Sequence, residues 1–325
     1  MSKFSGRRAA IGIAPESLRG TPVTPTYWIP WREVTDPHNK VETVKNDTSL
    51  ARIESSDGYA VIGKFGEIGW KTKLKDTHFG AILKSLFGSV SSVAKASPNT
   101  SVYDHTFSVL QSNQHPTVTI TYKDPNVDIA FANAMIGSLK IDAAQNNYIM
   151  YEVKTLSLPS AASTTTVAHV QENDFLPQQL VFKNANTQSG LDGASAVSIR
   201  SMSIEFSQNL LKEMNLGNTS PTDILNQDFD IKGSVTLTHS STAYSTLQDA
   251  GTVQALRFDL IHSATIGTSA NPELKIDLYK ASITNYSKKV TLGNMTEESF
   301  DFEAHYSLAD SKMVAVTLTN LATSY

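Results

Sequence analysis

The residues from Phe229 to Thr238 alternate between apolar and polar side chains. A period of two predicts a β-strand with one face in the core and the other in water. After position 238 the pattern changes: residues 240–242 are Ser-Ser-Thr, and apolar residues then recur at helical spacing until Gly251. Hydroxyl side chains cap helix N-termini, and glycine commonly ends a helix. The stretch 229–251 therefore predicts a strand, a cap, a short helix and a glycine stop.

A second stretch, residues 65–88, has the same organisation. Apolar and polar residues alternate over 68–75, and Asp76 or Thr77 can cap the helix that follows. The apolar stripe of this helix ends at Gly88. The spacing between the strand glycine and the final glycine is 19 positions here and 18 in the later unit. This match favours a tandem duplication, and chance recurrence of a common strand–helix unit is the alternative.

Most of the remaining chain also alternates with a period of two, in short segments separated by turn residues. Such regular spacing is typical of an antiparallel sandwich or barrel, so the predicted fold class is mainly β with short flanking helices. Residues 210–227 are predicted to form a loop around Gly217 and Pro221. The further predicted strands cover residues 104–110, 117–122, 127–131, 139–142, 149–153, 202–206, 256–260, 274–278, 300–308 and 314–318.

The chain divides into three predicted parts. Residues 1–30 are rich in Gly, Pro and Thr and predict an extended arm that lies on a neighbouring subunit or on its own core. Its apolar anchor, which we expect to work between subunits, consists of Tyr27, Trp28 and Trp31. Residues 31–160 and 161–325 are the two predicted β domains, with a boundary in the small, weakly polar segment 157–168. Residues 32–59 form a polar excursion that could reach a partner, and the tail after position 321 is expected to be flexible or docked on a neighbour.

Composition narrows the possible functions. The 325 residues include 27 Lys and Arg against 31 Asp and Glu, so no basic surplus indicates nucleic-acid binding. The absence of cysteine excludes disulfides and thiolate metal sites and fits assembly in a reducing cytosol. No apolar run approaches the roughly 20 residues of a membrane span, and the N-terminus lacks a signal-peptide core, so we expect no membrane association.

No catalytic constellation is apparent, and we expect neither an enzyme nor a cofactor or metal site. The eight histidines are scattered, and no G-x-S-x-G motif occurs. Two carboxylate pairs at i, i+2 spacing could indicate calcium or acid–base chemistry, but a solvated sheet face explains them better. The lysines at 71, 73 and 75 share a strand face, which favours a guarded edge strand, or a face that pairs with a neighbour's acids, over a phosphate site. The carboxylate pairs are Asp228 with Asp230 and Asp301 with Glu303.

The order of these features resembles the tail tube proteins of long-tailed, non-contractile phages. The resemblance spans most of the chain and is carried by an arm with G-T-P at 20–22, a charged excursion, F-G-A-I-L-K-S-L-F-G at 79–88, S-L-K-I-D at 138–142 and I-K-G-S-V-T-L-T at 231–238. It implies a β-sandwich or barrel flanked by a helix, whose copies form stacked rings around a channel. Such rings are usually hexamers, and duplicated subunits form trimers with pseudo-six-fold symmetry. The duplication favours a trimer, and a hexamer remains open.

The resemblance also implies partners and a location. We expect contact with a tape measure protein in the channel, with tail terminator and distal tail proteins, and transiently with duplex DNA, in a virion tail assembled in the host cytoplasm. A lysine-rich wall would hold DNA through counterion release, whereas a neutral or acidic wall would not. The expected channel-facing acids are Asp228, Asp230, Asp301 and Glu303. The alternative is a monomeric β-sandwich module of a baseplate or of a carbohydrate-binding protein.

Overall fold

The computed structural model describes residues 3–325 and confirms a mainly β fold with two short α-helices. The first half contains η1 (Gly6–Arg8), β1 (Ala10–Pro15), β2 (Tyr27–Ile29), β3 (Glu33–Thr35), β4 (Asn39–Asn46), β5 (Gly58–Gly66), β6 (Gly69–Lys73), α1 (Phe79–Phe87), β7 (Gly88–Ala94), β8 (Tyr103–Val109), β9 (Val118–Lys123), β10 (Asp128–Ala144), β11 (Met150–Leu156) and β12 (Ala161–Ala162). The second half contains η2 (Pro177–Gln179), β13 (Leu180–Ala185), η3 (Gln188–Gly190), β14 (Ile199–Glu213), β15 (Asp223–Thr238), α2 (Ala243–Asp249), β16 (Gln254–Ile261), β17 (Glu273–Lys289), β18 (Glu297–Ala304) and β19 (Val314–Asn320).

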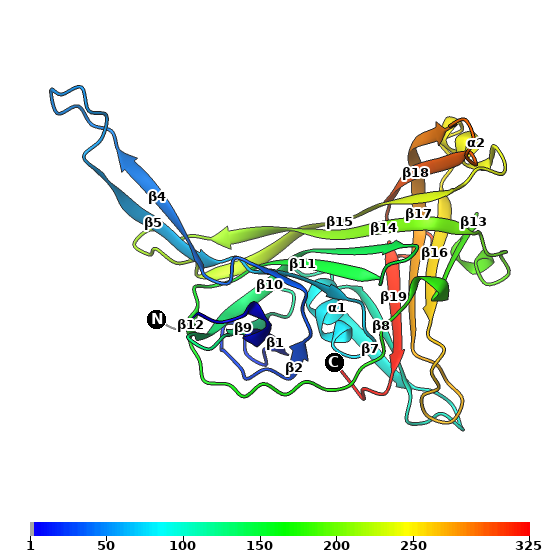
Figure 1. The fold of residues 1–325 in the computed structure, drawn as a ribbon, viewed down its shortest axis with the longest axis horizontal. Helices are drawn as coiled ribbons and strands as arrows, with labels where there is room; N and C mark the ends of the chain where they lie inside the picture. Colours follow the sequence, from blue (N-terminus) through cyan, green and yellow to red (C-terminus); the bar gives the residue numbers. More distant parts are fainter. Residues whose placement is uncertain (1–2) are drawn as a thin grey trace.

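Eight strands form one antiparallel sheet, which we call the central sheet. Their order is β3-β6-β11-β10-β14-β15-β18-β17. Figure 1 shows it crossing the middle of the molecule, with α1 and the N-terminal strands on one side of it. Strands from both halves of the chain therefore lie in a single sheet.

The two longest strands, β10 and β17, each belong to two sheets. Both contain 17 residues. The first half of β10 pairs with β9 and β12, and β1 and β2 continue this N-terminal sheet. The first half of β17 pairs with β16 and β19, and β13, β8 and β7 continue this lateral sheet. The second halves of β10 and β17 pair within the central sheet.

One hydrophobic core joins both halves of the chain. Phe87 of α1 lies 5.6 Å from Phe206 and 5.4 Å from Phe229, measured between ring centroids. On the α2 side, Tyr244 stacks on Phe300 at 4.5 Å. The predicted segments 31–160 and 161–325 therefore share a continuous core cluster. Apolar burial on alternate strand positions is what the period of two predicted.

Several predicted boundaries were wrong. The predicted strands 127–131 and 139–142 are parts of the single strand β10, and the predicted strand 300–308 ends at Ala304. Half of the predicted loop 210–227 consists of the ends of β14 and β15, which pair with each other up to Glu213 and Asp223. In β10, β14 and β15 backbone pairing with a neighbouring strand extends β-structure through residues whose own pattern is weak.

The N-terminal segment lies on its own core, which was one of its two predicted places. Strand β1 is buried and lies between β2 and β9. The loop that follows is held by Arg19, which donates to the carboxylate of Asp223 at 2.8 Å. At the other end of the chain, the hydroxyl of Tyr325 donates to the carbonyl of Thr77 at 2.6 Å. The tail therefore packs against the start of its own helix α1, which corrects the expectation of a flexible or neighbour-docked tail.

The helix stops were predicted correctly, whereas the cap of α1 was not. Gly88 and Gly251 have φ angles of 82° and 61°, the left-handed conformation that suits glycine at a helix end. The cap of α1 comes from far away in sequence: the backbone N–H of His78 donates to a Glu172 carboxylate oxygen at 2.7 Å. Asp76 instead accepts a hydrogen bond from the backbone N–H of Asn173 at 3.0 Å.

A buried polar cluster thus fastens the linker before β13 to α1. The other carboxylate oxygen of Glu172 lies 2.6 Å from Nδ1 of His78, and Nε2 of His78 lies 2.8 Å from the hydroxyl of Tyr151. All three side chains are buried. Because buried polar groups are costly when left without partners, the cluster depends on every member.

Glu172→Ala is expected to destabilise the protein by about 3 kcal/mol, because it leaves the buried N–H and ring of His78 without an acceptor. Urea unfolding followed by the fluorescence of the three tryptophans measures this loss. The control is Gln171→Ala at the exposed neighbouring position. A loss no larger than that of the control would show that Glu172 does not hold the linker.

Asp259 on β16 gives the lateral sheet a pH dependence. Burial, reinforced by the nearby Glu273 carboxylate, raises the pKa of Asp259 to about 6. The folded protein then binds this proton more tightly than the unfolded chain, so the contribution of Asp259 to stability is largest below about pH 4 and is lost as the pH rises through 6. Asp259→Asn should remove this fall and stabilise the protein at pH 7 by about 1 kcal/mol, a value reduced for partial solvent screening. Urea unfolding at pH 4.5 and 7 tests this, with exposed Asp249→Asn as the control; an unchanged pH dependence in Asp259→Asn would contradict it.

Candidate channel face and assembly surfaces

Three of the four predicted acids lie on one face of the central sheet. Asp230 belongs to β15, and Asp301 and Glu303 belong to β18. Their neighbours Ile231 and Phe302 point into the core, so the acids point to the opposite, free face. This face has no helix packed on it in the view of Figure 1.

Asp228 is placed differently from the other three. The pairing of β14 with β15 shifts register between Gln208 and Leu210, close to this residue. Asp228 lines a separate groove of about 620 Å³ together with Ser112 and Lys312. The sequence pattern therefore grouped Asp228 with Asp230, but the register shift separates them.

The free face is not an acidic strip. One charged residue from each of seven consecutive strands lies directly opposite the next, and we call this row the charge belt. From β3 to β18 its members are Glu33, Lys71, Glu152, Lys140, Glu205, Lys232 and Glu303. The sign changes at every step. Opposite charges placed directly across two strands stabilise a sheet by roughly 0.2–1 kcal/mol per pair.

The rows beside the belt include small neutral side chains. Ser138 of β10 faces Ser207 of β14, and Ser203 of β14 faces Ser234 of β15. The closest ion pair within the belt joins the Lys232 ammonium to the Glu303 carboxylate at 3.6 Å. The face therefore combines a row of balanced charge with a hydroxyl-rich surface.

One of the two expectations for the lysines of β6, a guarded edge strand, was wrong. Strand β6 pairs with β3 on one side and with β11 on the other. Lys71 belongs to the charge belt, whereas Lys73 and Lys75 pair with Asp174 at 3.1 and 2.7 Å. The two lysines help to hold the linker against the sheet.

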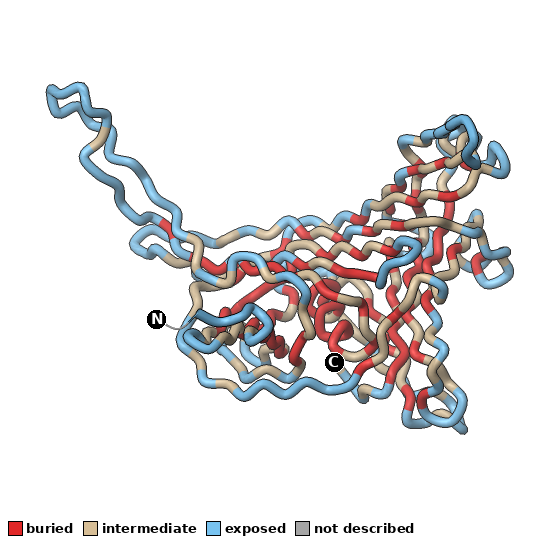
Figure 2. Tube along the Cα trace, viewed as in Figure 1, coloured by how far each residue is buried: buried red, intermediate tan, exposed pale blue. Residues whose placement is uncertain are grey.

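The polar excursion forms the hairpin β4–β5, which projects from the body of the molecule. Its strands pair with each other in a separate two-stranded sheet. Figure 2 shows nearly the whole hairpin exposed, and its apolar side chains are exposed too: Val44 by 50 %, Tyr59 by 74 % and Ile53 at the tip by 102 %. A lone two-stranded hairpin is marginally stable in water. Exposed apolar side chains on such an element indicate an interaction surface.

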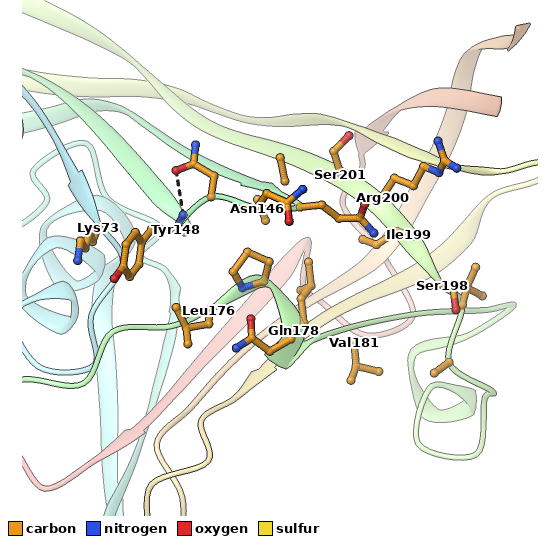
Figure 3. A pocket seen from close by; sticks show the side chains of 18 of the residues that line it. Lys73, Asn146, Tyr148, Leu176, Gln178, Val181, Ser198, Ile199, Arg200 and Ser201 are labelled. Carbon is orange, nitrogen blue, oxygen red and sulfur yellow. Dashed lines mark hydrogen bonds between the residues drawn. The ribbon is translucent and has the colours of Figure 1, made fainter. Parts of the chain in front are cut away.

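A groove of about 1290 Å³ lies at the other end of the central sheet (Figure 3). It is bounded by the β10–β11 turn, the edge strand β13 and the start of β14. Tyr148, Leu176, Val181 and Ile199 give it apolar walls. Its cationic residues are Arg32, Lys73 and Arg200.

The hairpin and the groove lie at opposite ends of the same strands. The hairpin leads into the Gly69 end of β6, and the groove includes Lys73 at the other end of that strand. In β14, Ser201 lines the groove, while Lys212 near the far end contacts Glu42 of the hairpin. A strand of 15 residues spans roughly 50 Å, so the two surfaces are far apart on one subunit.

The predicted aromatic anchor packs within its own chain. Trp28 is 5 % exposed, and the indole N–H of Trp31 donates to the carbonyl of Ala9 at 2.9 Å. Tyr27 packs near Tyr325, with ring centroids 6.0 Å apart. These contacts fasten residues 1–30 to their own subunit and give no support to the predicted role between subunits.

The buried histidines make local contacts within the fold. His105 lies 2.7 Å from the Ser92 hydroxyl, and His115 contacts the carbonyl of Leu86 at 3.1 Å. Across residues 3–325, no three His, Asp or Glu side chains gather as they would around a metal ion. Over the same residues, none of the helices has the length and apolar character needed to cross a membrane.

The sequence signals for these surfaces differ in strength. The alternation of Glu, Lys and Asp with apolar residues was visible within single strands, but the belt depends on which strands are neighbours. The hairpin was visible as a polar excursion, and its exposed valines and tyrosine could have indicated a binding surface. The groove had no signal, because its walls come from three distant segments.

Comparison with known proteins agrees with this architecture. The model of the phage tail tube protein family matches residues 6–304. A search of curated proteins finds no match to the chain. The match covers nearly the whole chain, from before β1 to the end of β18. On this ground the chain belongs to the phage tail tube protein family, whose members are structural proteins of the virion tail.

Proposed function

We propose that copies of this chain join edge to edge into rings, with the free face of the central sheet lining the channel of a long, non-contractile tail. The observation that carries the proposal is an eight-stranded sheet covered on one face and open at both ends. Within the described residues, β3 pairs with β6 alone, and residues 282–289 of β17 have a strand partner on the β18 side alone. Unpaired strand edges are sticky, and closure into a ring removes them.

We infer that the two halves of the chain are a tandem duplication and that the ring therefore contains three copies; the support is a similar strand order in the two halves. In the central sheet, the run β6-β11-β10 corresponds to β15-β18-β17. Strand β6 precedes α1 as β15 precedes α2, and the long strands β10 and β17 cross between sheets in the same way. Beside them, β1 and β9 correspond to β13 and β16. Three copies with eight strands each would supply about 24 strands, more than the 16–18 at which closed barrels already hold an aqueous channel.

We propose that rings stack by inserting the β4–β5 hairpin of one copy into the groove of a copy in the next ring. The two surfaces lie at opposite ends of the subunit, as a head-to-tail contact requires. The hairpin tip, residues 46–58, carries three acids and one arginine, whereas the groove has three cationic residues. Apolar side chains are present on both surfaces, so the contact would bury the exposed valines and tyrosine of the hairpin.

The remaining roles follow from a tube. The channel would hold the tape measure protein before it passes DNA, and the terminal rings would contact the terminator and distal tail proteins. The acids Asp230, Asp301 and Glu303 would face the channel, the chain would perform no catalysis, and assembly would take place in the host cytoplasm. The alternative, a monomeric binding module, has no observation in its favour, because the aromatic cluster that it needs packs within its own chain.

Purified protein at high concentration is expected to form stacked rings that electron microscopy resolves with threefold symmetry. Each ring should contain three 35.3 kDa chains. A stable monomer at every concentration would overturn the tube proposal. Rings with six copies would leave the tube intact and overturn the inference from the two related halves.

Engineered cysteines test the stacking contact without background, because the natural chain has none. Oxidised tubes of the double variant Ile53→Cys/Gln178→Cys should give a ladder of covalently linked chains, since tip and groove meet between rings. Each single variant should give no ladder. The matched control is Ile53→Cys/Val170→Cys, where Val170 is exposed outside the groove. A ladder in the control without one in the test variant would place the hairpin elsewhere.

A further inference from the structure

The charges of the belt alternate in sign, although the same seven residues could stand in other orders. The belt contains four carboxylates and three ammonium groups, and no two like charges are neighbours along seven strands. Adjacent strands lie about 4.8 Å apart, so the β-carbon of each belt residue lies about 5 Å from that of an oppositely charged residue on each side where the belt continues. The pattern joins strands from both halves of the chain.

We propose that this order of charges, rather than the net charge of the face, keeps the wall from binding duplex DNA. The inference rests on the proposed function, because it requires the free face to line the channel. The partner is a double-stranded polyanion that must pass without being retained. The belt presents no cluster of cations to it.

The physical argument is one of distances. Salt screens charges over about 8 Å at physiological ionic strength, which is longer than the spacing along the belt. The fields of neighbouring opposite charges therefore cancel over a shorter distance than that over which solvent ions screen them. The field of the row fades within a few ångströms of the wall. DNA, with one charge per about 1.7 Å, binds strongly only where several cations can displace its counterions together.

The other charges on the face fit the same account. The charged residues that flank the belt are Lys73, Lys154, Asp142, Asp230 and Asp301. Lys140 lies 3.4 Å from Asp142, and Lys73 is paired with Asp174 at 3.1 Å. The cation Lys154 faces Ser138 across the strands, not a second lysine. The serines that fill the neighbouring rows add no charge. No two lysines are neighbours within the belt, and Lys73, the lysine next to Lys71 along β6, already pairs with Asp174.

An exchange of two belt residues separates charge order from net charge. Glu205→Lys/Lys232→Glu keeps the composition but places a cation beside Lys140 and an anion beside Glu303. Glu205→Gln/Lys232→Gln is the matched control, because it changes the same positions, keeps the net charge and creates no like-charged neighbours. The readout is the retention of a short labelled DNA duplex by sedimented tubes at 50 and 300 mM salt.

Tubes of the exchange variant are expected to retain the duplex at least about tenfold more strongly at low salt than wild type, and to lose it at high salt. Wild-type and control tubes should not retain it. If exchange tubes form normally and stay as inert as wild type, the proposal is overturned. Should the exchange variant fail to assemble, Lys71→Glu/Glu152→Lys makes the same rearrangement in the other half of the belt, beside Glu33 and Lys140. Failure of the proposed function can be distinguished from failure of this inference, because in the first case the wild-type protein itself forms no tubes.

Discussion

The structure depends on one constraint: the central sheet is amphipathic, and its own chain covers only one of its faces. Side chains such as Phe206, Phe229 and Phe300 point toward α1 and α2, which lie on the same side of the sheet. Burying a large apolar side chain contributes roughly 1.5–3 kcal/mol, so this side forms the core. The other face must then be polar, and its residues can be those that the assembly of subunits requires.

The bend in β10 and β17 follows from the same constraint. Each strand leaves the central sheet and continues into a second sheet, which folds back over the core. A strand that belongs to two sheets fixes the position of one sheet relative to the other, because its backbone is continuous. The free face of the central sheet and the lateral sheet are therefore held in a fixed arrangement. A subunit that stacks in register within a wall requires such an arrangement.

Polar contacts between distant segments complete this arrangement. Glu172 and Asp174 tie the linker between the two halves to α1 and β6, and Arg19 ties the N-terminal segment to β15. Such contacts carry little of the total stability at the surface, but the buried Glu172 cluster is costly to break. These polar contacts hold segments without regular secondary structure against the hydrophobic core. The contacts are not themselves part of that core.

The sequence by itself determined the elements: the alternation of Phe229, Ile231 and Val235 predicted a strand, and Gly88 and Gly251 predicted the helix ends, because these signals are local. It could not determine that 127–131 and 139–142 are one strand, nor that Glu172 caps α1, because both depend on pairing and packing between distant residues. The charge belt is the clearest case. Each of its residues is visible in the sequence, but only the register of seven strands, set by long-range backbone pairing, decides that Glu33, Lys71 and the five that follow form one row.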